Sequence, residues 1–77
     1  MSVPFVEVEW WDAFAVGGWS TPQELDDRLE KWIPERTRGF LVRSDGEALV
    51  LAMNEDDPWL NCQAIRKCCV VRVRRVG

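Results

Sequence analysis

The sequence predicts a mainly β protein with one short helix, arranged as a small five-stranded SH3-like barrel or curled antiparallel sheet. Five segments alternate apolar and polar residues with the period of two that is typical of half-buried strands. Only one segment carries helix signals, which excludes a parallel sheet covered by helices on both faces. A length of 77 residues allows one compact domain, residues 1–77. Its expected radius of gyration is ~11 Å.

The first expected strand covers residues 5–11 and places Val6, Val8 and Trp10 on one side. The segment that follows loses this alternation and ends in the pair Gly17-Gly18. We expect a turn there that lets Trp19 fold back onto the sheet. A phosphate-binding loop is the weaker alternative, because neither of the two glycine-rich phosphate motifs is present.

The expected helix begins with a capping box, in which Thr21 and Glu24 satisfy each other's backbone N–H groups and Pro22 occupies the first turn. Pro34 ends this helix at about Trp32. We expect the helix to cap an open end of the barrel through one apolar face, formed by Leu25, Leu29 and Trp32 or Ile33.

The second half of the chain predicts four more strands. A hairpin joins the alternating segments 36–43 and 48–53 through the turn Ser44-Asp45-Gly46-Glu47. Residues 54–58 form an acidic solvent loop, and residues 59–65 a short fourth strand. A tight turn at 66–68 leads into the last strand, 69–76, which places Val71, Val73 and Arg75 on one side.

Composition argues against an enzyme. The chain has no His and no Tyr, so the commonest general base and metal ligand are missing. Carboxylate pairs exist at Glu7 and Glu9 and at Asp26-Asp27, but a solvated strand face and a solvated helix face are the better explanation for them. We therefore expect no catalytic residue, no metal site and no cofactor.

The three cysteines, Cys62, Cys68 and Cys69, lack the spacing of a zinc site. Adjacent strand residues point to opposite faces, so Cys68-Cys69 is a poor disulfide pair. Reduced thiols and the absence of a signal peptide or a long apolar run predict a soluble, cytoplasmic protein.

Charge is distributed unevenly along the chain. Residues 1–35 carry eight acids and two bases, and residues 36–77 carry five acids and eight bases. The basic residues of the C-terminal stretch suit the phosphates of a small ligand, whereas overall acidity disfavours long nucleic acid. The alternative is that Arg72 and Arg74 pair with Glu7 and Glu9 across neighbouring strands.

Five Trp are more than so small a core easily hides. Trp10 and Trp11 must point to opposite sides of their strand. Each Trp is therefore assigned to one of three roles: packing in the core or against the helix, burial in a subunit interface, or stacking on a ligand.

Several segments resemble small uncharacterised proteins of tailed phages: Val6-Glu7-Val8-Glu9-Trp10, Gly18-Trp19, residues 37–52 (TRGFLVRSDGEALVLA), and the ending formed by residues 65–67 and 71–76. The resemblance implies an SH3-like barrel without catalytic function. It also implies the role of an anti-defence sponge, a homo-oligomer in the host cytoplasm that sequesters a cyclic or related signalling nucleotide. The residues expected to bind it are Trp11, Trp19, Arg43, Arg66, Arg72 and Arg74.

A different class of function is compatible with the same residues. SH3-like domains commonly dock host or virion proteins through an exposed sheet edge or an aromatic patch. The partner is then a protein and not a nucleotide, and no membrane is involved in either case.

Overall fold

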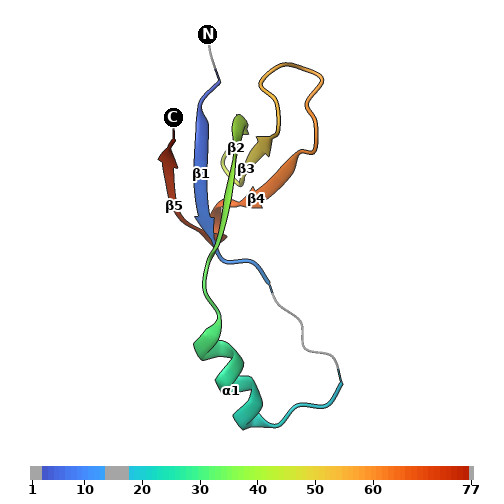
Figure 1. Cartoon of the computed structure of the whole chain (residues 1–77), viewed down its shortest axis with the longest axis vertical. Coiled ribbons are helices and arrows are strands. Elements are labelled where there is room, and N and C mark those ends of the chain that lie inside the picture. The colour runs from blue at the N-terminus through green and yellow to red at the C-terminus, as the bar shows by residue number, and fades with distance from the viewer. Residues whose placement is uncertain (1–2, 14–17, 77) are drawn as a thin grey trace.

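The computed structural model describes residues 3–13 and 18–76 and shows one helix, five strands and one short 3₁₀ turn in that part of the chain (Figure 1). In order, they are β1 (Phe5–Trp10), α1 (Pro22–Lys31), β2 (Glu35–Ser44), β3 (Ala48–Ala52), β4 (Gln63–Arg66), η1 (Lys67–Cys69) and β5 (Val70–Arg75). The expected mainly β class with one short helix is confirmed.

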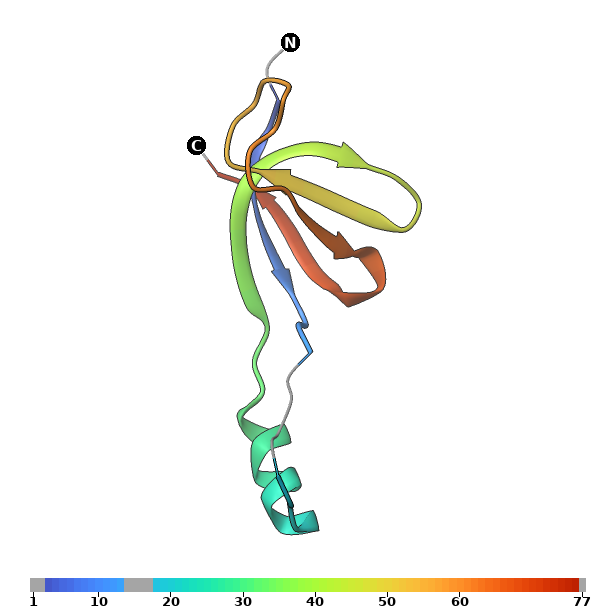
Figure 2. The same ribbon diagram turned by 90° about the vertical axis from the view of Figure 1, so that its right-hand side faces the viewer.

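The strands form one open antiparallel sheet in the order β4-β3-β2-β1-β5. The sheet is strongly curled, and η1 carries the chain from one edge strand, β4, to the other, β5 (Figure 2). The curled-sheet form of the prediction is therefore the one observed. The edges of this sheet remain available for contacts because nothing in the described residues pairs with their outer sides.

The curl is made by β2, which pairs with two different neighbours along its length. Residues 35–40 pair with β1, and residues 40–44 pair with β3. A register shift between Leu41 and Arg43 bends the strand at the crossover, as β-bulges do. Just before it, Gly39 lets the two strands approach closely, since a Cβ there would lie 3.0 Å from Leu51 Cβ and 3.1 Å from the carbonyl oxygen of Ala52.

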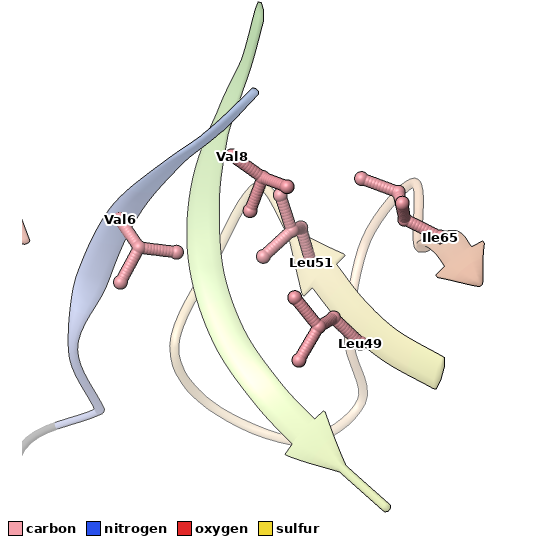
Figure 3. Packing of buried hydrophobic residues seen from close by; sticks show 5 residues of the cluster. All are labelled: Val6, Val8, Leu49, Leu51 and Ile65. Atoms are coloured by element: carbon pink, nitrogen blue, oxygen red, sulfur yellow. The ribbon is translucent and has the colours of Figure 1, made fainter. Parts of the chain in front are cut away.

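The core lies inside the curl and is small. Its buried apolar cluster consists of Val6 and Val8 from β1, Leu49 and Leu51 from β3, and Ile65 from β4 (Figure 3). The same face of β1 as predicted is buried, and Trp10, Leu41 and Val70 pack against the cluster from its rim. These side chains fill the interior, so a ligand has to bind on the surface.

The helix begins as predicted. Thr21 Oγ1 accepts from the Glu24 N–H at 3.2 Å, and the Glu24 carboxylate accepts from the Thr21 N–H at 3.4 Å. Trp32 is the residue that follows the last turn.

The expected position of the helix is wrong. α1 has no buried residue and projects beyond the ends of β1 and β2 instead of capping the sheet (Figures 1 and 2). Trp32 holds it there by donating its indole N–H to the Asp12 carbonyl at 3.0 Å. The molecule therefore measures 52 × 23 × 22 Å, and its radius of gyration is 15.6 Å.

The hairpin turn at residues 44–47 is confirmed and has a clear cause. Asp45 Oδ1 accepts from the N–H groups of Glu47 and Ala48, at 2.8 and 2.9 Å. These hydrogen bonds lower the pKa of the Asp45 carboxyl, and they fix the turn without a positive φ at Gly46.

The predicted fourth strand is too long. It begins at Gln63 and not at residue 59, because Asn61 adopts a positive φ of 50° that interrupts extended backbone. Cys69 belongs to η1, so the last strand begins at Val70.

We predict that Gly39→Ala destabilises the protein by about 1–3 kcal/mol, because the new methyl group presses on β3 backbone that cannot move without separating the strands. Gly46→Ala is the matched control. Its Cβ meets nothing within 4 Å, so a change below about 0.5 kcal/mol is expected. Urea unfolding measures both, and equal stability of the two variants would contradict the role given to Gly39.

Candidate functional site

The outer face of the sheet carries a ladder of ion pairs across three strands. Glu7 on β1 accepts from Arg38 Nε on β2 at 2.8 Å and from Arg74 Nε on β5 at 3.1 Å. The Glu7 carboxylate, which is almost fully buried, thus links β1 to both strands that pair with it, β2 and β5. Glu9 repeats the pairing with Arg72 at 3.2 Å.

The hydrogen bonds from Arg38 and Arg74 lower the pKa of Glu7 from 4.5 to about 2. Two guanidinium donors stabilise the ionised carboxylate more than its burial destabilises it. Glu7 therefore stays charged throughout the ordinary pH range.

Two of the expected ligand-binding residues, Arg72 and Arg74, lie in this ladder. The alternative that they pair with Glu9 and Glu7 is the arrangement observed. Binding a phosphate there requires an existing ion pair to open, and their role as ligand contacts remains a prediction.

The other two arginines of the expected set lie elsewhere. Arg43 on β2 is 3.6 Å from Asp45 and largely exposed. Arg66 ends β4 and has no carboxylate within 4 Å among the described residues. It lines a hollow of about 270 Å³ together with Gly46, Glu47, Lys67 and Cys68. Lys67, like Arg66, forms no ion pair within 4 Å in the described structure, although its charge helps to lower the pKa of Asp45.

The tryptophans divide among different surroundings. Trp10 is half-buried and donates its indole N–H to Thr37 Oγ1 at 2.9 Å. Trp11, just after β1, meets Trp32 edge to face, with ring centroids 5.1 Å apart. Trp19 is fully exposed, at 102% of its reference area.

The expectation that Trp19 folds back onto the sheet is therefore wrong. Gly18 has the expected positive φ of 74°, but residues 18–21 lead into the far end of the projecting helix, away from the sheet (Figure 1). Gly17, the other half of the predicted turn, lies outside the described residues. The hollow of about 270 Å³ at η1, which Arg66 lines, includes neither Trp11 nor Trp19.

Residues 53–62 form the tip loop. Residues 54–58 are a solvent-exposed loop, as expected, whereas the strand expected from residue 59 begins only at Gln63. Side-chain hydrogen bonds, which the sequence pattern did not predict, organise the loop. Asn54 Nδ2 donates to the carbonyls of Asp56 and Pro58, and its Oδ1 accepts from the Leu60 N–H at 2.7 Å. Met53 N–H closes the base of the loop on Leu60 O at 3.0 Å.

The tip loop presents apolar side chains to solvent. Met53, Trp59 and Leu60 are between 45% and 65% exposed. The available sequence signal was the Asn followed by Asp, Pro and Trp, but turn chemistry alone does not say that a nearby Trp stays exposed. The loop lies at the opposite end of the molecule from α1 (Figure 1).

The cysteines are free, as expected. The geometric reason given for Cys68 and Cys69 does not hold, because they lie in the 3₁₀ turn with their sulfurs 3.8 Å apart and not on opposite faces of a strand. The Cys68 thiol and partial burial raise the pKa of Cys69. Within residues 3–13 and 18–76, no three Cys, Asp or Glu side chains gather in a way that would hold a metal ion.

No protein-family model, curated protein or solved structure matches this chain. In the described part of the chain, α1 is far too short and too polar to cross a membrane. The resemblance to phage proteins stays a prediction.

We predict that Arg38→Gln makes the protein unfold at higher pH during acid titration. The pKa of Glu7 is lower in the folded state than its ordinary value of 4.5, so its stabilisation is complete above pH 4.5 and is lost as the pH falls towards about 2. Removing one guanidinium raises the pKa of Glu7 in the folded state, so the stabilisation is lost at a higher pH and covers a narrower pH range.

Arg36→Gln is the control, because Arg36 lies two residues away on β2 and has no carboxylate within 4 Å in the described structure. Tryptophan fluorescence against pH follows both variants. Identical acid midpoints would show that the Arg38–Glu7 pair does not contribute to stability.

Proposed function

We propose that this protein is a non-catalytic docking module that binds another protein through the tip loop. The observation that carries the proposal is an exposed Trp59 and Leu60 on a loop whose backbone is fixed by three hydrogen bonds to one side chain, Asn54. Rigid aromatic anchors of this kind dominate the binding energy of protein interfaces.

Preorganisation supports the proposal. Ordering a flexible loop at an interface opposes binding, and a loop that is already ordered avoids most of that loss. The Asn54 network, with the base closed between Met53 and Leu60, provides this order before any partner arrives.

Charge specifies the partner. The tip loop carries Glu55, Asp56 and Asp57, and none of them has a cation within 4 Å in the described structure. A protein surface with an apolar pocket for Trp59 and a rim of Lys or Arg is complementary to this arrangement.

A second candidate function is the sequestration of a small anionic ligand, such as a cyclic signalling nucleotide of anti-phage defence. The observation in its favour is the hollow at η1, where Arg66 and Lys67 have no paired carboxylate and Gly46 leaves the approach open. Glu47 lines the same hollow, and its negative charge opposes the binding of an anionic ligand there. The docking module is therefore the first candidate and sequestration the second.

We predict that Trp59→Ala abolishes docking. The protein, immobilised and exposed to a bacterial lysate, is expected to retain partners that the variant loses by about 30-fold or more, in line with loss of a hot-spot residue. Trp19→Ala, which removes a more exposed indole from the other end of the molecule, should retain them.

Asn54→Ala distinguishes the contribution of the Trp59 side chain from that of loop rigidity, because it keeps Trp59 but removes the hydrogen bonds that fix the loop. It should weaken capture less than Trp59→Ala does. Quantitative mass spectrometry of the retained proteins reads out all three variants, and an unchanged set with Trp59→Ala would eliminate the tip loop as the docking site.

For the second candidate, we predict that one member of a panel of cyclic di- and trinucleotides raises the melting temperature by about 4–8 °C, the shift expected for roughly 1 kcal/mol in a domain of this size. Arg66→Ala should remove the shift, and Arg36→Ala should keep it. If no nucleotide shifts the melting temperature, sequestration is the wrong function.

A further inference from the structure

The projecting helix has an apolar face that its own chain does not cover. The arm surface consists of Leu25 and Leu29 on α1 and of Ile33, which lies two residues beyond the helix end; these side chains are 42%, 52% and 72% exposed. A ten-residue helix is marginal by itself, and a capping box adds only about 1 kcal/mol. Burial of the arm surface against another surface is the ordinary source of the missing stability.

A matching surface lies on β5. Val71, Val73 and Arg75, the β5 strip, share one side of the strand, and the two valines are about half exposed. β5 is also an edge strand that pairs only with β1 in the described sheet. Proteins commonly protect such an edge by covering it with a helix.

Charge makes the two surfaces complementary. Residues 12–35, which include the arm, carry six acids and two bases, whereas the rest of the chain has one more base than acids. Asp26 flanks the arm surface next to Leu25, and Arg75 ends the β5 strip. Neither has an ion-pair partner within 4 Å among the described residues.

The arm is held away from its own β5 strip. The Trp32 indole donates to the Asp12 carbonyl, and its ring packs on Trp11, so α1 extends past the end of the sheet (Figure 2). A helix that extends in this way reaches a neighbouring molecule more readily than it folds back.

We propose that the arm surface of one chain docks on the β5 strip of a second copy, and that the second copy returns the same contact. The result is a twofold exchange dimer with two identical interfaces, each pairing an acidic, apolar helix with a basic, apolar strand edge. It goes beyond the docking function of the tip loop and leaves both tip loops free.

Multi-angle light scattering on the full chain tests the proposal. The expected mass is twice 8.9 kDa. Leu29→Asp on the arm and Val71→Glu on the strip should each give monomers, since both sites are exposed and neither change disturbs the core. Lys31→Asp, which places the same residue on the opposite face of α1, should remain dimeric.

Mixing the two monomeric variants gives the decisive result. The intact arm of the Val71→Glu chain can dock on the intact strip of the Leu29→Asp chain, so the mixture should recover a weaker heterodimer. An interface between two arms or two strips would not recover. A monomeric wild-type protein, or a mixture that stays monomeric, overturns the proposal.

Charge reversal provides an independent check with smaller perturbations. Asp26→Arg and Arg75→Glu should each weaken the dimer by roughly tenfold, and mixing the two variants should restore association. Circular dichroism confirms that the strands of each variant remain folded. Charge variants that associate as tightly as the wild type would contradict the pairing of Asp26 with Arg75.

Discussion

The geometry of this protein depends on one strand, β2, that serves two partners. Its crossover near Gly39 and the bulge after Leu41 turn the sheet on itself, so that Val6 and Val8 meet the side chains of β3 and β4. The enclosed space is filled by a handful of aliphatic residues. In the described part of the chain these side chains occupy the inside of the curl, so a ligand is expected to bind on the outer surface.

Pairing across the strands decides which charges are available to a ligand. Composition identifies a basic C-terminal stretch, but antiparallel register places Arg72 and Arg74 opposite Glu9 and Glu7. Those cations hold the sheet together, whereas Arg66 and Lys67 at the η1 turn form no ion pair within 4 Å among the described residues. Binding potential follows from register more than from the number of charges.

The predictable parts of the structure were those that depend on local rules. Alternation identified β1 because one of its faces is in the core, and the capping box located the start of α1 because both partners are three residues apart. The position of α1 was not predictable, because an amphipathic pattern indicates that the apolar face of the helix is to be buried but does not indicate which surface buries it. The ordered structure of the tip loop was not predictable either, because it depends on side-chain hydrogen bonds of Asn54, which leave no periodic pattern in the sequence.

The chain begins and ends in adjacent strands, where the Val76 N–H donates to the Phe5 carbonyl and Glu7 meets an arginine 67 positions later. Such a pairing closes almost the whole chain into a loop, whose entropy opposes it until other contacts exist. The β2–β3 hairpin, in contrast, is local. Folding should therefore proceed outward from this hairpin, with β5 added last and at a rate limited by the search for its distant partner.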